Sequence, residues 1–263
     1  MKDLEVIVVD NNSSDDSVEM VNKYFTQVKL IKNDKNVGFS AGNNIGIKKS
    51  KGKLVLLVNS DVEVNPDTLS KMMEFVNQRP ELGAATCRLN LADGRIDPAC
   101  HRGFPTPWAA FSYLSGLEKS FPRSKTFSGY HQGFKDLSTL HEVDVISGAF
   151  FLIPKAVIEK VGLMDEQFFM YGEDIDWCYR INQTGYKIMF NPLAVAVHHK
   201  RQSGRARKSE ERRGKSEEEI KKQTDYYFVH SMEQFYWKHY LGKYPRFVSE
   251  LIFAVIRVKK RLI

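Results

Sequence analysis

Hydrophobic residues follow two different spacings along the first 90 residues of this 263-residue chain. Short β-branched or apolar runs predict strands at Leu4–Val9, Val28–Ile31, Leu54–Val58 and Gly83–Leu89. Between them, apolar residues three or four positions apart predict helices at Asp16–Phe25, Ala41–Ser50 and Pro66–Gln78. Strands that alternate with helices and are apolar throughout indicate an α/β fold with a mostly parallel sheet, flanked by helices on both faces.

The pattern is less regular in the second half of the chain. Residues 95–140 are rich in glycine, proline, serine and aromatic residues without a lasting period, which predicts a long irregular insertion. Further strands are expected at Val143–Ile153, Lys187–Phe190 and Ala194–His198, and further helices at Lys155–Val161 and Asp174–Thr184. A charged run over residues 200–223 precedes an amphipathic helix that carries Phe228, Met232, Phe235 and Tyr236. We therefore expect one domain over residues 1–204, and a charged linker with amphipathic helices over residues 205–263.

Composition changes this picture little. Hydrophobic residues make up 42% of the chain and charged residues 27%, which is typical of a soluble globular protein. The net charge of +7 is compatible with nucleic acid, with an anionic membrane surface or with a nucleotide diphosphate as partner. Cys87, Cys100 and Cys178 form no C-x-x-C pair, which argues against a disulfide framework or zinc site and favours the reducing cytoplasm. Because residues 1–10 show no signal peptide and Leu251–Ile256 is too short to span a bilayer, we expect a soluble or membrane-peripheral protein.

Three polar clusters each follow a predicted strand, at residues 10–14, 36–44 and 59–62. Ligands of open α/β sheets bind beyond the carboxyl ends of the strands, where these clusters meet. Asp10 could accept the imide N–H of uracil or thymine, while Gly38 and Gly42 would let the backbone approach a ligand. The helix that begins near Ser40 offers N–H groups to a phosphate. Each cluster alone is more typical of a helix cap or turn, but together they predict a nucleotide-diphosphate site.

Acidic residues and one histidine supply the remaining candidate chemistry. Asp61 follows an apolar strand, where a carboxylate can hold Mg²⁺ or Mn²⁺ against a diphosphate. Glu173, Asp174 and Asp176 crowd the start of a helix, although the helix dipole needs only one acidic side chain. A buried carboxylate among aromatic side chains has a raised pKa and suits a general base. His198 ends a strand and is a candidate metal ligand, with a structural histidine as the alternative.

The order of these motifs resembles family 2 of the glycosyltransferases, in its rhamnosyltransferase-like branch. The resemblance covers residues 4 to about 204, and it continues weakly in the tail. It depends on seven motifs in this order: Asp10-Asn11-Asn12-Ser13-Ser14-Asp15; Asn36-Val37-Gly38-Phe39 with Gly42-Asn43-Asn44; Asn59-Ser60-Asp61; Ser147-Gly148-Ala149; Asp165-Glu166; Phe169-Met170-Tyr171-Gly172-Glu173-Asp174-Ile175-Asp176; and His198 with Ser203.

The resemblance implies a GT-A fold with a C-terminal helical tail, a nucleotide-sugar donor, Mg²⁺ or Mn²⁺, and transfer with inversion. Asp61 stands at the last position of the family's D-x-D metal motif, in which Asn59 replaces the first aspartate, and His198 would be the second ligand. Asp174 would be the general base, with Glu173 and Asp176 as the other catalytic candidates. The donor site would be lined by Asp10, Asn12, Asn36, Gly38, Gly42, Asn43 and Asn59.

The resemblance also suggests partners. The expected donor is dTDP-rhamnose first and a UDP-hexose second, and the expected acceptor is a glycan or lipid-linked sugar in cell-surface polysaccharide synthesis. Residues 95–140 and the tail are expected to form the acceptor site. Residues 246–263 combine Phe247, Leu251, Ile252, Val255 and Ile256 with a basic end, which suits the inner surface of an anionic membrane. The alternative is a helix docked on the domain.

One departure from the family leaves alternatives open. Family members begin with an Ile- and Val-rich strand and a helix before the strand expected at Leu4–Val9. This chain has neither, so we expect an N-terminally truncated protein that lacks a central strand. The alternatives are a non-catalytic remnant, a basic protein that binds membranes or nucleic acid through residues 201–213, and a nucleotidyltransferase. The acidic residues of segment 201–213 argue against nucleic acid, and the Glu173–Asp174 pair argues against a nucleotidyltransferase.

Overall fold

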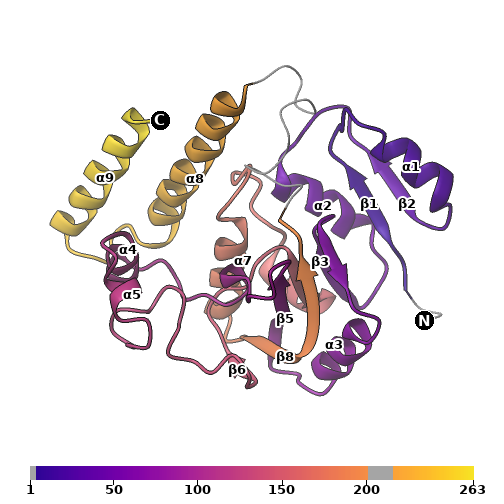
Figure 1. The fold of residues 1–263 in the computed structure, drawn as a ribbon, viewed down its shortest axis with the longest axis horizontal. Coiled ribbons are helices and arrows are strands. Elements are labelled where there is room, and N and C mark those ends of the chain that lie inside the picture. Colours follow the sequence, from indigo (N-terminus) through magenta and orange to yellow (C-terminus); the bar gives the residue numbers. More distant parts are fainter. Residues whose placement is uncertain (1–3, 201–215) are drawn as a thin grey trace. The chain divides into compact units, whose positions relative to one another are not determined.

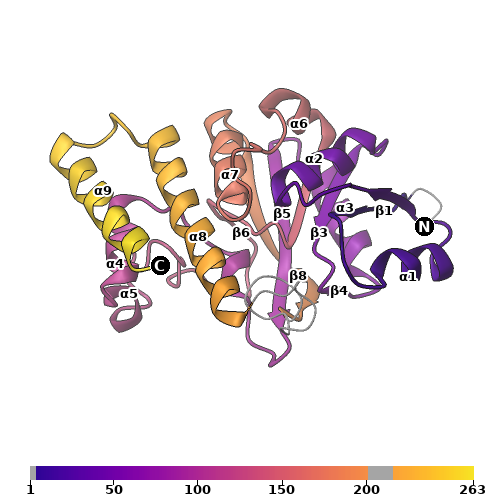
Figure 2. The ribbon, with the colours of Figure 1, turned by 90° about the horizontal axis from the view of Figure 1, so that it is seen from above.

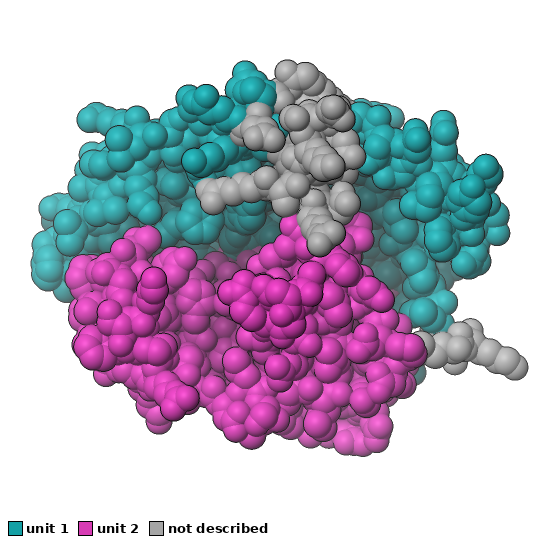
Figure 3. All heavy atoms as spheres, in the orientation of Figure 1, with its two compact units in different colours: residues 1–53, 163–173, 201–263 teal, residues 54–162, 174–200 magenta. Residues whose placement is uncertain are grey.

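The computed structural model describes residues 4–200 and 216–263 of the chain. The chain divides into two compact units, which Figure 3 shows in different colours. The first comprises residues 1–53, 163–173 and 201–263, and the second comprises residues 54–162 and 174–200. The expected boundary at residue 204, the motif residue Ser203 and the basic segment 201–213 all lie outside the described residues. The division into residues 1–204 and 205–263 therefore stays a prediction.

The first unit begins with a parallel strand pair (Figure 1). β1 (Ile7–Asp10) pairs with β2 (Lys29–Lys32), and α1 (Ser17–Tyr24) connects them. α2 (Phe39–Lys49) packs on β1, where a Cβ atom at Gly46 would lie 3.3 Å from a methyl group of Val9. All four elements were predicted from the spacing of apolar residues. No residue of β1 is fully buried, however, so this strand is less enclosed than its apolar sequence predicts.

Two C-terminal helices complete the first unit, which confirms the expected helical tail. α8 (Glu217–His239) begins at Ser216, whose hydroxyl accepts from the N–H of Glu219 while the Glu219 carboxylate accepts from the N–H of Ser216. α9 (Arg246–Arg261) runs back alongside α8 in Figures 1 and 2. The Tyr236 hydroxyl lies 2.9 Å from the Ser249 hydroxyl at the contact between the two helices.

The second unit contains a six-stranded mixed sheet flanked by helices, which confirms the α/β class. Its order is β3-β7-β5-β8-β4, with β6 also pairing with β8. Among the described strands, β1–β2 and β5–β8 are the parallel pairs and the other four pairings are antiparallel, so strand direction differs from the mostly parallel sheet that we predicted. Apolar strands report burial, which does not specify direction. The strands are β3 (Leu54–Val58), β4 (Val62–Val64), β5 (Leu82–Leu91), β6 (His141–Glu142), β7 (Phe150–Pro154) and β8 (Lys187–His198).

Aromatic packing joins this sheet to its helices. The rings of Phe151 on β7 and Trp177 stack at 5.0 Å between centroids, and both side chains are fully buried. Trp177 also donates from its indole N–H to the carbonyl of Gly162 at 2.9 Å. These contacts fix the helix that carries the acidic cluster against the sheet. The helices of this region are α3 (Thr68–Asn77), α6 (Lys155–Val161) and α7 (Glu173–Gln183).

The segment expected to be irregular contains three short helices, so that prediction was wrong in part. They are η1 (Pro98–Cys100), α4 (Pro107–Leu114) and α5 (Leu117–Ser120). α4 begins in the usual way, because the Thr106 hydroxyl accepts from the N–H of Ala109 and Pro107 is the first helical residue. η1 and α5 have only three and four residues, and α4 is apolar almost throughout, so none of the three shows a period in the sequence.

Two strand predictions also change. β7 begins only at Phe150, because the preceding residues form a turn in which the Ser147 hydroxyl accepts from the N–H of Ala149. The two short strands expected at 187–190 and 194–198 form the single strand β8, in which Pro192 lacks the N–H that a ladder requires. The register with β5 moves there from Cys87–Asn191 to Arg88–Val195. The bulge therefore explains why the sequence shows two strands.

Candidate functional site

The register between β4 and β8 brings together the two predicted metal ligands. Val62 pairs with His198, so Asp61 lies at the end of β8 although 137 positions separate it from the histidine. His198 Nε2 lies 3.3 Å from Asp61 Oδ1, and the side chains are only 6% and 1% exposed. A buried carboxylate oxygen and a buried imidazole nitrogen thus face each other.

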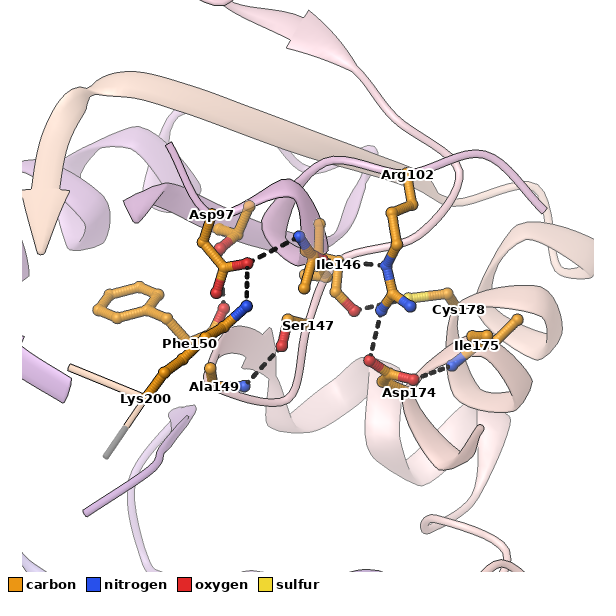
Figure 4. A network of polar contacts seen from close by, with 12 residues as sticks. Asp97, Arg102, Ile146, Ser147, Ala149, Phe150, Asp174, Ile175, Cys178 and Lys200 are labelled. Atoms are coloured by element: carbon orange, nitrogen blue, oxygen red, sulfur yellow. Dashed lines mark hydrogen bonds and ion pairs between the residues drawn. The ribbon is translucent and has the colours of Figure 1, made fainter. Parts of the chain in front are cut away.

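Asp97 holds the opposite side of the His198 ring. His198 Nδ1 lies 2.7 Å from Asp97 Oδ2. On the other oxygen, Lys200 Nζ lies 2.8 Å from Asp97 Oδ1 (Figure 4). Burial of His198 opposes its charge, but the hydrogen bonds with Asp61 and Asp97 outweigh burial and raise the pKa of His198 to about 9. Burial would likewise raise the pKa of Asp97, but its bonds to His198 and Lys200 lower that pKa to about 2. We did not predict Asp97, because an aspartate directly before a proline, here Pro98, is typical of a turn.

These residues fit a divalent cation. An oxygen and a nitrogen ligand suit Mg²⁺ or Mn²⁺, and a ligating histidine commonly donates its second ring N–H to a carboxylate, as His198 does to Asp97. Within residues 4–200 and 216–263 there is no group of three or more His, Cys, Asp or Glu side chains arranged to hold a metal ion. Two protein ligands leave the other positions to water and a substrate phosphate, which is how Mg²⁺ is usually held in such sites.

Asp174 lies in the first turn of α7 and is fixed from two directions. Its Oδ2 accepts from Arg102 Nη2 at 2.6 Å, and its Oδ1 accepts from the N–H of Ile175 at 2.8 Å (Figure 4). The Arg102 and Asp174 side chains are each 12% exposed. Each carboxylate oxygen has a second lone pair, so Asp174 retains the capacity to accept a proton. We did not predict Arg102, because it lies in the irregular segment 95–140, where we recognised no motif.

The other two acidic candidates have different surroundings. Asp176 is fully buried and pairs with Arg180 at 2.8 Å, while Arg180 also donates to the carbonyl of Val161 at 2.9 Å. These bonds connect α7 to the end of α6, so the contacts of Asp176 are structural. Glu173 is 7% exposed and begins α7. Of the three, Asp174 has the geometry that best suits a base, although the catalytic assignment stays a prediction.

Asn11 ties together two of the polar clusters in the first unit. Its Nδ2 donates to the carbonyl of Gly38 at 2.9 Å, and its Oδ1 accepts from Asn33 Nδ2 at 3.0 Å. The loop after β1 and the loop after β2 therefore lie side by side. Asp10 accepts from the N–H of Ser13, and Asn12, with a left-handed φ of 64°, donates to the carbonyl of Asp34.

The two glycines of the predicted donor site are surrounded by protein atoms. At Gly38, with φ +89°, a Cβ would lie 2.6 Å from the carbonyl oxygen of Phe169, and at Gly42 it would lie 3.2 Å from Asn11 Nδ2. The contact and the positive φ therefore require glycine at position 38, and the Asn11 side chain leaves little room for a larger residue at position 42. The approach of a ligand to these glycines stays a prediction. The N–H of Phe39, the first of α2, also donates to the Phe169 carbonyl at 2.7 Å.

The remaining predicted donor residues make local contacts. The Asn36 side chain accepts from the N–H of Gly38, and Asn43 Nδ2 donates to the carbonyl of Phe39, each at 2.9 Å. Asn59 donates from its backbone to Ala149 and accepts from the N–H of Val62, both at 3.1 Å. Asn59 therefore forms the turn that places Asp61. The role of these residues in binding a nucleotide sugar stays a prediction.

Several known proteins are similar in sequence to this chain. A hexosyltransferase of low-salt glycan biosynthesis from Haloferax volcanii, Agl10, is 28% identical over 74% of this chain and 58% of its own length. N-acetylglucosaminyl-diphospho-decaprenol L-rhamnosyltransferase from Mycobacterium tuberculosis is 25% identical over 76% of this chain and 68% of its own length. The uncharacterized protein y4gI from Sinorhizobium fredii is 29% identical over 82% of this chain, which spans only 23% of that protein.

Solved structures show the same fold. A structure of GalNAc-T7 with UDP, GalNAc and Mn²⁺ superposes with a TM-score of 0.57 and 17% identity, over 87% of this chain and 41% of that one. Staphylococcus aureus TarS 1–349 with UDP-GlcNAc superposes with a TM-score of 0.53 and 18% identity, over 86% of this chain and 58% of that one. These similarities confirm the expected GT-A fold. Residues 1–162 match the family described as Glycosyl transferase family 2, and the chain therefore belongs to that family.

Proposed function

We propose that this chain is an inverting glycosyltransferase of cell-surface polysaccharide synthesis. It transfers a sugar from a nucleotide-diphosphate donor, dTDP-rhamnose or a UDP-hexose, to a glycan or lipid-linked acceptor. Family membership and the names of the H. volcanii and M. tuberculosis relatives support this proposal. The observation that supports it most lies within the second unit. Asp97 bonds to His198, which faces Asp61, and Arg102 bonds to Asp174, so one turn contacts both centres.

Each residue of these two centres has a distinct task. Asp61 and His198 would hold Mg²⁺ or Mn²⁺, and that ion would neutralise charge on the leaving diphosphate. Asp97 keeps the proton on His198 Nδ1, so that Nε2 faces Asp61. Asp174 takes the proton of the acceptor hydroxyl as that oxygen attacks the anomeric carbon. Attack opposite the leaving diphosphate in a single displacement inverts the configuration at that carbon.

The nucleoside end of the donor is assigned to the loops after β1 and β2 of the first unit. Asp10 accepts the imide N–H of the base, and the other donor-site residues of this unit are Asn12, Asn36, Gly38, Gly42 and Asn43. Asn59, in the second unit, is the remaining residue predicted to contact the donor. Uracil and thymine present the same imide N–H, so Asp10 is compatible with UDP- and dTDP-sugars alike. GalNAc-T7 is solved with UDP and TarS 1–349 with UDP-GlcNAc, and both have the same fold as this chain, which supports a nucleotide-diphosphate donor.

The acceptor is assigned in part to α4. Trp108 and Phe111 are 49% and 54% exposed, and their rings lie 5.6 Å apart. The indole N–H of Trp108 donates to the carbonyl of Thr126 at 2.8 Å, which fixes the ring at the surface. A fixed aromatic surface suits the apolar face of a sugar ring. This assignment keeps the expectation that residues 95–140 contribute to acceptor binding.

The tail is assigned to an anionic membrane surface. Five apolar side chains of α9 and its end lie three or four positions apart and are 44–81% exposed: Phe247, Leu251, Val255, Val258 and Leu262. Arg257, Lys259 and Arg261 are interleaved with this stripe. An exposed apolar face beside basic residues matches the chemistry of anionic lipid headgroups. None of the described helices is long and apolar enough to cross a membrane.

The opposite face of α9 packs on α8. This contact agrees in part with the alternative stated for the tail, a helix docked on the protein. Ile256 and Ser249 are 5% and 8% exposed, and the ring of Phe253 packs edge-on against Tyr236. Ile256 was expected among the membrane-facing residues and belongs instead to this inner face. The stripe proposed to meet lipid is therefore the outer face alone.

A donor screen tests the proposed reaction. The full chain is incubated with Mn²⁺, a mixture of polyprenol-linked and free glycan acceptors, and either dTDP-rhamnose or single UDP-hexoses, while release of nucleotide diphosphate is followed. We expect acceptor-dependent release with one donor. Binding of UDP or dTDP without turnover of any donor would instead identify a non-catalytic relative.

A further inference from the structure

Asp97 and Arg102 belong to one short turn that contains the helix η1. Asp97 accepts from the N–H of Ala99 through Oδ1 at 2.9 Å, and Arg102 donates from Nε to the carbonyl of the same Ala99 at 3.0 Å. Ala99 is therefore bonded to both side chains. A displacement of Ala99 would disturb both hydrogen bonds, so the positions of the Asp97 and Arg102 side chains are coupled.

The Asp97 end of this turn reaches His198. The Asp97 side chain is fully buried, and its two oxygens lie within 2.7–2.9 Å of His198 Nδ1, Lys200 Nζ and the Ala99 N–H. A carboxylate with three donors around it has little freedom to rotate. It therefore sets the orientation of the His198 ring, whose Nε2 faces Asp61 at 3.3 Å.

The Arg102 end reaches Asp174. The Arg102 backbone exchanges two hydrogen bonds with Val145, at 3.0 and 2.9 Å, so the residue is held at its main chain as well as at Ala99. Its guanidinium then donates to Asp174 Oδ2 at 2.6 Å from a position that is 12% exposed (Figure 4). The planar guanidinium has fixed donor directions, so it orients the carboxylate as well as neutralising it.

We propose that the turn from Asp97 to Arg102 is a positioning element of the transfer site. Through Asp97 it orients the imidazole of His198 towards the cation, and through Arg102 it orients the carboxylate of Asp174 towards the acceptor hydroxyl. The proposal rests on the proposed function, and it adds two residues that act through others. These six consecutive residues thereby set the separation between the metal ligand His198 and the base Asp174.

Two substitutions test the two ends separately. Asp97→Asn should weaken Mn²⁺ binding in the presence of UDP by about 10- to 100-fold, because the outer carboxylate of a ligating histidine is lost. Arg102→Lys keeps the charge but cannot reach both Ala99 and Asp174 with the same geometry. It should lower kcat about tenfold or more, leave the donor KM within about twofold, and leave Mn²⁺ affinity unchanged. Calorimetry and steady-state kinetics supply these readouts.

Matched controls separate positioning from general loss of stability. Asp93→Asn removes an exposed carboxylate of the preceding loop that pairs with Arg95, and Arg79→Lys changes an arginine that donates to the carbonyl of Phe75. Both should match the wild type in Mn²⁺ affinity and kcat. Wild-type values for Asp97→Asn in Mn²⁺ affinity, or for Arg102→Lys in kcat, would overturn the proposal.

A measurement on the unmodified protein covers the case in which Asp97→Asn does not fold. Long-range ¹H–¹⁵N NMR of the histidine rings should show His198 protonated at Nδ1, with or without Mg²⁺, and an unprotonated Nδ1 would overturn the proposal. Failure of the proposed function is distinguishable. A wild type that binds Mn²⁺ but transfers no sugar would refute the function and this role with it, whereas active variants would refute the positioning role alone.

Discussion

His198 Nε2 lies 3.3 Å from Asp61 Oδ1 because the antiparallel register of β4 and β8 pairs Val62 with His198. The hydrogen bond from the His199 N–H to the Asp61 carbonyl, at 2.8 Å, continues this pairing by one residue. The two side chains therefore keep their separation through backbone bonds on both sides.

Removal of either proposed ligand should weaken metal-dependent donor binding. Asp61→Ala and His198→Ala should each reduce the affinity for UDP or dTDP in the presence of Mn²⁺, as measured by calorimetry, with little effect in EDTA. His199→Ala is the matched control, because His199 is 40% exposed at its side chain and pairs with Glu63 instead. Full-strength binding by both variants, or a parent whose binding does not depend on metal, would contradict the assignment.

The metal-free protein should lose stability at alkaline pH. The pKa of His198 is raised from 6.5 to about 9, since its bonds to Asp61 and Asp97 outweigh burial. A raised pKa contributes stability that is complete below pH 6.5 and lost as the pH rises through 9. In EDTA, the free energy of unfolding should fall by about 1–3 kcal/mol more in the wild type than in His198→Gln over this range. Urea titrations at several pH values would measure it, and parallel pH curves for the two proteins would contradict it.

Asp174→Asn should abolish transfer while it preserves nucleotide binding. The asparagine oxygen can still accept from Arg102, so the fold should remain, but the amide cannot take a proton. Loss of a general base lowers the rate by about 10²–10⁴-fold. Asp176→Asn serves for comparison, because its loss of the bond to Arg180 should reduce stability more than the turnover of folded protein. If Asp174→Asn kept wild-type turnover, the base would have to be Glu173 or Asp176.

Gly38→Ala should destabilise the first unit. A Cβ at Gly38 would lie 2.6 Å from the Phe169 carbonyl oxygen, in addition to the cost of its φ of +89°. Gly242→Ala is the matched control, with a φ of +84° in the same unit and nothing within 4 Å of the added Cβ. Urea unfolding should show a loss of about 1 kcal/mol for the control, which is the cost of the backbone conformation alone, and a clearly larger loss for Gly38→Ala. Equal losses would show that the contact with Phe169 contributes nothing.

The outer stripe of α9 should bind anionic vesicles. Phe247→Ser combined with Leu251→Ser removes two side chains that are 70% and 64% exposed and leaves the inner face intact. This double variant should no longer pellet with vesicles that contain phosphatidylglycerol, and wild-type binding should weaken as salt increases. Met20→Ser, which changes a 43% exposed residue of α1, should behave as the wild type. Equal pelleting with neutral and anionic vesicles would contradict the assignment.

Motif order in the sequence was sufficient to identify the family and the GT-A fold. Local periodicity located most helices, and α6 was predicted at its observed bounds, because an amphipathic helix repeats its pattern within a few residues. Periodicity failed for α4, whose residues Pro107–Leu114 are apolar almost throughout and so do not alternate with polar ones. It also failed for the three-residue strand β4, which is too short to repeat a pattern although it places Asp61.

The sequence by itself determined which residue types were available for metal binding and base catalysis, since Asp61, His198 and Asp174 each stand in a recognisable motif. Only the tertiary structure decided what holds them. Asp97 is 101 positions from His198, and Arg102 is 72 positions from Asp174, so neither pair produces a local pattern. Strand direction also depends on the tertiary structure. A buried strand is apolar whether it pairs in parallel or antiparallel, so its sequence does not specify the direction. The contacts of Asp97 and Arg102 exist because β8 and α7 bring distant segments to one turn.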